Sequence, residues 1–181
     1  MPRHTQTFAA PKALVNAVCS LTFPTGLVSF DVWKQIWRLY GLIDVDITDR
    51  DSTLAFVFSR MRIVDDQSER SRMHLTYLGF EDFLEGVCRL AVRKVLPTDD
   101  EIAAAGRASA GEYLWCLRDE QPKEYAELIK QRTLAWGMEP PQPVARCIAH
   151  FCSLLVVTCQ QNKGDGVQLT KRQVNAFMKL S

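Results

Sequence analysis

The chain has 181 residues, of which 47% are hydrophobic and 24% are charged, and its 22 basic and 21 acidic side chains leave a net charge of +1. This composition is typical of a globular protein and excludes a chain that is disordered throughout. A nearly neutral chain lacks the positive field that draws proteins to nucleic acid or to an anionic membrane, so we expect neither partner. The longest nearly uncharged run, 147–161, is shorter than the ~20 apolar residues that cross a bilayer.

The cysteines indicate a reducing compartment. None of them forms a Cys-x-x-Cys pair, most lie in apolar stretches, and we expect no secretion signal at the N-terminus. Such thiols are typical of core positions in a cytosolic protein. The six cysteines are Cys19, Cys88, Cys116, Cys147, Cys152 and Cys159.

In the first part of the chain, a polar tail over 1–10 precedes two predicted helices. The first covers 12–21. Ser29 is a suitable N-cap for the second, over 30–40, and Gly41 is a suitable stop. The apolar residues of the second helix share one face. They are Phe30, Trp33, Ile36, Trp37 and Tyr40.

Two further helices are predicted before residue 97. Thr48 is a suitable N-cap for a helix over 49–62, the charged residues 63–73 form a loop, and a fourth helix covers 78–93. The helical period predicts which side chains face the core. These are Leu54, Val57, Phe58 and Met61 from the third helix, and Phe80, Phe83, Leu84, Val87, Leu90 and Ala91 from the fourth.

The second half of the chain is also predicted to be helical. Two helix starts, a capping box over Thr98–Glu101 and a proline at Pro122, predict a helical hairpin over 97–139. Residues 140–143 form a stiff Pro-rich linker. The helix that follows, over 144–159, is apolar on nearly all sides and is expected to be the most buried.

One pattern occurs three times: a helix, a polar or Gly-containing loop, a very short extended piece and a second helix. This is the EF-hand plan, in which two loops pair through a miniature ladder. We therefore predict an all-α fold, with an EF-hand-like pair over 11–96 and a C-terminal helical extension. In that extension, 144–181 supplies the buried helix and a third, unpaired unit. The extended pieces are Leu27-Val28, Leu75-Thr76 and Val167–Leu169.

The predicted loops lack calcium ligands. A calcium-binding EF-hand loop needs oxygen ligands at positions 1, 3 and 5 and a carboxylate at position 12. With Val28 at position 8 of the first loop, position 12 is Val32. With Leu75 at position 8 of the second loop, position 12 is Gly79, and in the third loop it is Gln173. We therefore predict no metal site and no cofactor.

Residues 27–93 carry an ordered series of motifs. An aromatic-led helix is followed by an Ile-Asp turn, a Thr-x-x-Asp helix start, a Val-Phe-Ser-Arg element and a Phe-x-x-Phe-Leu helix that ends in Leu-Ala. The residues are Phe30, Trp33, Leu42–Asp44, Ile47-Thr48, Asp51, Val57–Met61, Leu75-Thr76, Phe80, Phe83-Leu84 and Leu90-Ala91.

This series resembles the core of the tubulin polymerisation-promoting protein family. It is equally similar to the degenerate EF-hand segments of ciliary and flagellar proteins. Residues 97–181 depart from the family. The resemblance implies an all-helical module that binds tubulin or another axonemal protein, in the cytoplasm, at the cytoskeleton of a cilium or flagellum.

Basic clusters mark the expected contact surfaces, because tubulin surfaces are acidic. An exposed tryptophan would add to them, since aromatic side chains dominate interface hot spots. The other interpretation is that these cations complement helix C-termini and that tryptophans at helical spacing belong to the core. The expected partner-binding residues are Arg60, Arg62, Arg70, Arg72, Trp33, Lys171 and Arg172.

No catalytic site is predicted. His150 and Cys152 are two positions apart on a helix, so their side chains point to different faces. We expect a non-enzymatic, calcium-independent, microtubule-associated structural protein of the axoneme, with no small-molecule ligand. The alternative is a soluble EF-hand-type regulatory adaptor that captures an amphipathic helix of a partner in a groove.

Overall fold

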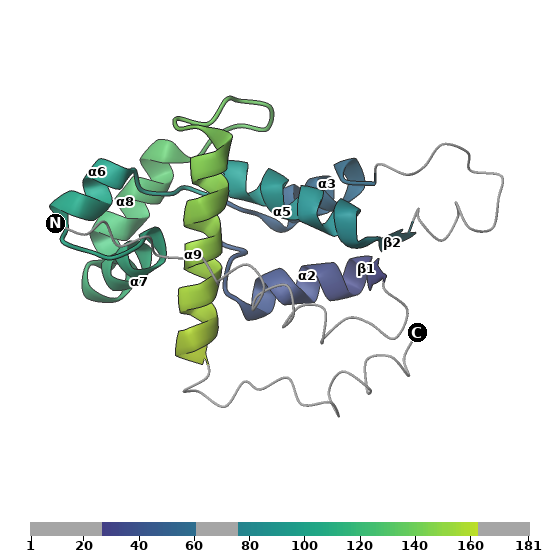
Figure 1. Ribbon diagram of the computed structural model, residues 1–181, viewed down its shortest axis with the longest axis horizontal. Helices are drawn as coiled ribbons and strands as arrows, with labels where there is room; N and C mark the ends of the chain where they lie inside the picture. Colours follow the sequence, from purple (N-terminus) through teal and green to yellow (C-terminus); the bar gives the residue numbers. More distant parts are fainter. Residues whose placement is uncertain (1–26, 61–75, 163–181) are drawn as a thin grey trace, which may run out of the picture.

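The computed structural model describes residues 27–60 and 76–162. Within these ranges it contains seven helices and one two-stranded sheet, which confirms an all-α fold with very short β pieces (Figure 1). Four predicted segments lie outside the described residues. They are the tail 1–10, the helix 12–21, the loop 63–73 and the segment after residue 162. The elements are β1 (Val28–Ser29), α2 (Phe30–Leu39), α3 (Asp49–Phe58), β2 (Tyr77–Leu78), α5 (Phe80–Arg93), α6 (Asp99–Ala104), α7 (Ala110–Glu120), α8 (Pro122–Arg132) and α9 (Val144–Asn162).

The helix termini follow the predicted capping residues. Ser29 caps α2 by accepting a hydrogen bond from the backbone N–H of Val32, 3.3 Å away. Capping boxes begin α3 at Thr48 and α6 at Thr98. At the end of α2, Gly41 has a φ of +61°, a conformation that favours glycine and reverses the chain after the helix.

The two strands pair as the predicted ladder requires, with a shifted register. β1 and β2 are antiparallel, and Val28 lies opposite Leu78. The second extended piece was expected at Leu75-Thr76, but Thr76 is helical and the strand begins at Tyr77, two residues later than expected. Each strand is followed at once by a helix, α2 or α5, which is the order that a pair of helix–loop–helix units predicts.

The first region packs around Trp33, whose side chain is completely buried. The indole N–H of Trp33 donates to the backbone oxygen and to Oγ of Ser52, both at 3.0 Å. On the opposite helix a Cβ at Gly86 would lie 2.5 Å from Cη2 of Trp33. Small residues on α3 and α5 therefore provide the space that the indole fills.

This packing corrects the predicted core face of α3 and part of that of α5, whose Phe83, Val87, Leu90 and Ala91 are buried as predicted. The buried face of α3 consists of Asp51, Ser52, Ala55 and Phe56. Four large side chains that were expected inside are exposed: Val57 by 39%, Phe58 by 52%, Phe80 by 44% and Leu84 by 38%. The predicted helical period is right. The faces that pack against Trp33, however, are those with small residues, Ser52 on α3 and Gly86 on α5, because they leave room for the indole.

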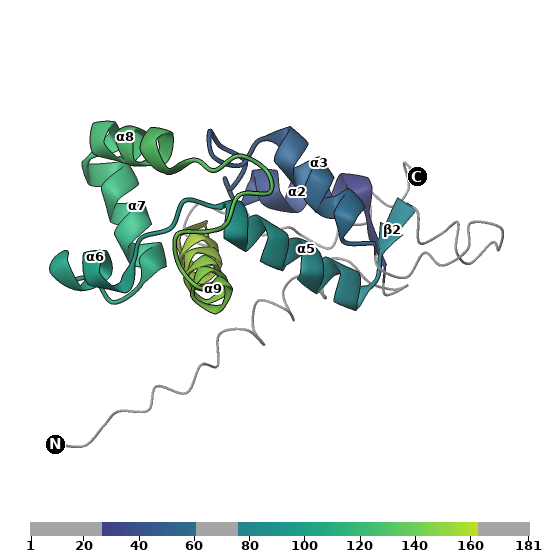
Figure 2. The same cartoon turned by 90° about the horizontal axis from the view of Figure 1, so that it is seen from above.

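Helix α9 lies between two groups of helices. On one side are α2, α3 and α5, and on the other are α6, α7 and α8; Figure 2 looks nearly along α9 and shows the two groups apart. Phe151 on α9 is completely buried, and its ring centroid lies 6.2 Å from that of Trp37. One hydrophobic core therefore joins α9 to the first region.

Helix α9 was expected to be the most buried helix, and this is wrong, because a larger share of the α5 residues is buried. The buried side chains of α9 form one stripe, and Cys152 and Val156 on other faces are half-buried. By length and composition α9 could also cross a membrane, although core helices pass the same test. Its buried stripe consists of Cys147, His150, Phe151, Leu154, Leu155 and Thr158.

The predicted hairpin over 97–139 consists of three helices instead of two. Gly106, with a φ of +62°, separates α6 from α7. Helix α8 begins at Pro122 as predicted and ends at Arg132. Residues 140–143 then lead into α9, and the Gln142 side chain donates to the backbone oxygen of Pro97 at 3.4 Å.

Candidate functional site

The candidate site is a cleft of about 390 Å³ that is lined by residues from the end of α2, from α7 and from the C-terminal half of α9. A smaller recess of about 30 Å³ shares five of its lining residues and continues inward toward Leu114 and Tyr125. The residues that line the cleft are Arg38, Tyr40, Gly41, Trp115, Arg118, Asp119 and Thr158.

The turn after α2 holds one wall of the cleft in place. The N–H of Gly41 donates to the backbone oxygen of Arg38, and the N–H of Leu42 donates to that of Trp37. These two bonds form a Schellman motif, which satisfies carbonyl groups that a helix end otherwise leaves unpaired. The motif fixes Tyr40 and Gly41 at the mouth of the cleft.

Helix α7 supplies the opposite wall. Trp115 and Arg118 are three positions apart, so their side chains lie on the same face of the helix. The helix itself is held against α9 at Gly111, whose N–H donates to Oγ of Ser153 at 3.0 Å. A Cβ at Gly111 would lie 2.7 Å from the carbonyl carbon of Ser153, so only glycine permits this approach.

The cleft carries an incompletely neutralised positive charge. Arg38 forms an ion pair with Asp49, with Nη2 and Oδ1 2.8 Å apart, on the exposed surface. Arg118 is also exposed but forms no ion pair with another residue in the part of the chain that the structure describes. Asp119 is the one acidic residue of the lining. Within 27–60 and 76–162, the Arg118 guanidinium is therefore the cation of the cleft that is left for an anion.

The floor of the cleft is a buried polar network. Nζ of Lys94 lies 2.8 Å from Oδ1 of Asp46, and both side chains are almost inaccessible. Oδ2 of Asp46 also accepts from the backbone N–H of Val95 at 2.9 Å. Beside this pair, the Tyr125 hydroxyl donates to Asp44 at 3.2 Å. The network joins α5, α8 and the loop after α2, and it leaves Lys94 unavailable to a ligand.

Both tyrosines of the cleft are proton donors at neutral pH. Burial and the nearby Cys159 thiol raise the pKa of Tyr40 above its ordinary value. Burial and the carboxylates of Asp46 and Asp44 do the same for the pKa of Tyr125. The Tyr125 hydroxyl is engaged by Asp44 and the Tyr40 hydroxyl by Cys159, so the donor that the cleft offers beside the indole of Trp115 is the Arg118 guanidinium.

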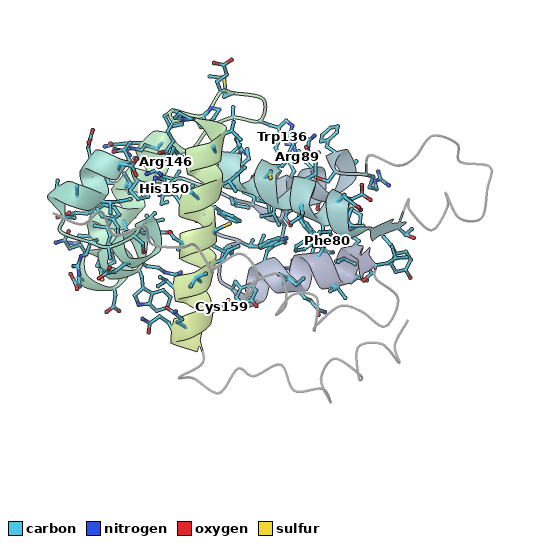
Figure 3. All side chains as sticks on the ribbon, viewed as in Figure 1. Phe80, Arg89, Trp136, Arg146, His150 and Cys159 are labelled. Carbon is cyan, nitrogen blue, oxygen red and sulfur yellow. The ribbon has the colours of Figure 1, made fainter. Side chains whose placement is uncertain are left out.

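The described residues do not form a nucleophilic or metal-binding centre. No group of three His, Cys, Asp or Glu side chains with metal-binding geometry occurs within 27–60 and 76–162. Burial raises the pKa of the Cys88, Cys147 and Cys152 thiols, which disfavours the reactive thiolate. Burial lowers the pKa of His150, which lies on the α6 side of α9 with Arg146 (Figure 3).

The partner-binding residues expected from the sequence lie elsewhere. Trp33 is completely buried, so the expectation that it contacts a partner is wrong, because the small residues around it enclose the ring. Nε of Arg60 donates to the backbone oxygen of Val57 at 3.1 Å, at the end of α3. The remaining expected residues, Arg62, Arg70, Arg72, Lys171 and Arg172, lie outside the described residues.

The cleft residues were not singled out from the sequence. The spacing of Trp115 and Arg118 and the helix stop at Gly41 are visible there. The contact between them is not, because it depends on how α9 brings α7 beside the end of α2. No protein-family model, curated protein or solved structure matches the chain.

Proposed function

We propose that this chain is a non-enzymatic, calcium-independent structural protein that associates with microtubules in a cilium or flagellum and binds tubulin or a neighbouring axonemal protein. The family resemblance of residues 27–93 supports the location. The observation that carries the mode of action is the position of α9. Phe151 covers Trp37, so the apolar face shared by α2 and α5 is already occupied.

The occupied face favours this proposal over the regulatory adaptor. A groove-capturing adaptor needs an open apolar groove for the partner helix. Here Phe151 is 0% exposed and Leu155 is 2% exposed, so α9 takes the place of a captured helix. A partner helix could enter only by displacing α9, and this would open the core of the protein.

The register of the ladder supports calcium independence. With Leu78 opposite Val28, position 12 of the second loop is Asp82 instead of Gly79. The Asp82 carboxylate accepts from the backbone N–H of Gly79 at 3.1 Å and caps α5. Counting back from Leu78 places Ser71, Met73 and Leu75 at positions 1, 3 and 5, so two of these three side chains carry no oxygen.

Co-sedimentation with microtubules tests the proposal. The protein is added to preformed microtubules and, separately, is present while tubulin polymerises, so that inner and outer surfaces are both accessible. We expect saturable pelleting that weakens as the salt concentration rises and is the same with calcium or with a chelator. No pelleting in either arm, or pelleting only with calcium, would overturn the proposal.

A second arm distinguishes the adaptor. The protein is mixed with a model amphipathic helix made of leucine and lysine, and binding is followed by fluorescence anisotropy. We expect no saturable binding by the folded protein. The matched variant Phe151→Ala uncovers Trp37 and is expected to gain binding if the face is accessible. Tight binding by the unaltered protein would favour the adaptor instead.

A further inference from the structure

We propose that the cleft between α2, α7 and α9 binds the side-chain carboxylate of an acidic segment of a protein partner, with Arg118 as the principal contact. The inference rests on the proposed function for the identity of the partner, and it names the surface and the chemistry of that contact. It rests on four features of the cleft: its charge, its aromatic walls, its size and its rigidity.

Arg118 is the cation of the cleft that suits one carboxylate. Two guanidinium groups and the Asp119 carboxylate line the cleft, and a second carboxylate, Asp49, lies just outside the lining. Arg38 is partly satisfied by Asp49, whereas Arg118 has no ionic partner among the described residues. A guanidinium binds a carboxylate through two parallel hydrogen bonds, a geometry that lysine cannot supply. A phosphate dianion would bring more negative charge than this lining neutralises.

The walls of the cleft favour a peptide over an isolated anion. Trp115 and Tyr40 stand beside Arg118, so the aliphatic part of a glutamate side chain and the adjoining main chain would contact aromatic surface. The volume of about 390 Å³ lies within the usual range of binding pockets, roughly 300 to 1,000 Å³.

The cleft is rigid before any ligand binds. The Schellman motif fixes Tyr40 and Gly41, and the contact at Gly111 fixes α7 against α9. The hydrogen bond from the Tyr125 hydroxyl on α8 to Asp44, beside the buried pair of Lys94 and Asp46, ties the floor to both groups of helices. On binding, only the Arg118 side chain and the ligand need to become ordered. The entropic cost of binding is therefore low.

Binding of a fluorescein-labelled hexaglutamate peptide to the full chain tests the inference. We expect the variant Arg118→Glu to bind about tenfold more weakly or worse, which corresponds to about 1.4 kcal/mol. Arg118→Lys should fall between the two, because it keeps the charge but loses the paired hydrogen bonds. The matched control Lys130→Glu reverses an exposed charge on α8 outside the cleft and should bind within about twofold of the unaltered protein.

Two readouts keep the outcome unambiguous. The midpoint of thermal unfolding should be unchanged in Arg118→Glu, because the side chain is exposed and forms no described ion pair. In NMR spectra, hexaglutamate should shift the indole signal of Trp115 more than those of the other three tryptophans. Equal weakening by Lys130→Glu, no effect of Arg118→Glu, or equal competition by inorganic phosphate would each overturn the inference.

Failure of the inference and failure of the proposed function have different signatures. If Arg118→Glu loses hexaglutamate binding but the unaltered protein does not pellet with microtubules, the cleft stands and the microtubule proposal fails. If both proteins pellet equally and neither binds hexaglutamate, the microtubule proposal stands and the cleft inference fails. If pelleting and peptide binding weaken together in Arg118→Glu, both are supported.

Discussion

The two groups of helices are stabilised in different ways. The first, over 27–96, encloses Trp33 among small residues and has an aromatic core of its own. The second, over 97–139, buries few large side chains, Ile102 in α6, Leu114 in α7 and Ile129 in α8, and Leu114 belongs to the core that the first region shares with α9. Its helices are held by the ion pair of Arg132 with Glu101 and by the contact of α7 with α9.

This contrast shows that a region can be well ordered without a core of its own. The second group depends on α9, which depends in turn on Trp37 of the first group. We therefore expect damage to the first region to unfold the whole molecule, whereas damage to the second should remain local. The following predictions test this asymmetry, in order of decreasing effect on stability.

Replacing Trp33 should cause the largest loss. We expect Trp33→Ala to lower the free energy of unfolding by about 5 kcal/mol, because it leaves a cavity and removes the partner of Ser52. Chemical denaturation measures the change. The matched control is Trp136→Ala, whose side chain is 37% exposed and should cost far less. Equal losses in the two variants would contradict the assignment of Trp33 to the core.

Breaking the buried ion pair should affect both groups. We expect Lys94→Met to lower the free energy of unfolding by about 3 kcal/mol, because the Asp46 carboxylate stays buried without its cation. The double variant that combines Lys94→Met with Asp46→Asn removes that charge. It should regain more than half of the lost free energy of unfolding. If denaturation shows no recovery in the double variant, the loss comes from packing of the lysine stem and not from the uncompensated charge.

Widening the contact between α7 and α9 should have a local effect. We expect Gly111→Ala to cost about 2 kcal/mol, because the new methyl group overlaps the backbone of Ser153. Hydrogen exchange should rise in α7 and α8 and stay unchanged in α5. The control Ser153→Ala removes the hydrogen bonds of the hydroxyl with Gly111 and with the backbone oxygen of His150 but adds no overlap, and it should cost about 1 kcal/mol. Faster hydrogen exchange in α5 would show that the second group of helices does not unfold independently of the first.

Acidification should produce the smallest effect. Hydrogen bonds from Arg132 lower the pKa of Glu101 from 4.5 to about 2 in the folded protein. A depressed carboxyl pKa stabilises the fold above the unfolded value, so this contribution is lost as the pH falls from 4.5 toward 2. We expect it to be about 1 kcal/mol or less, because the pair is partly exposed. In denaturation curves, Glu101→Gln should lack this part of the pH dependence, whereas Glu124→Gln should retain it.

Local signals in the sequence located most of the helices. The caps at Ser29, Thr48 and Thr98, the stop at Gly41 and the proline at Pro122 each satisfy or omit backbone groups within a few residues. Their effect does not depend on the rest of the fold. These positions could therefore be read from the chain alone.

Faces and contacts over long distances could not be read in this way. Phe58 and Leu84 are large and apolar, and hydrophobicity alone assigned them to the core. The deciding property was the small size of Ser52 and Gly86, which matters only when Trp33 lies between α3 and α5. The cleft was missed for the same reason, because Tyr40 and Arg118 meet only after α9 is in place.

The position of α9 in the chain also bears on biosynthesis. A ribosome delivers α2 and α5 long before α9, so the face around Trp37 stays uncovered while the intervening helices are made. An exposed aromatic surface of this kind is the form that chaperones recognise on a nascent chain. Release of the chaperone should then coincide with the emergence of Phe151 from the ribosome. A nascent chain that is stalled before residue 144 should remain bound to the chaperone.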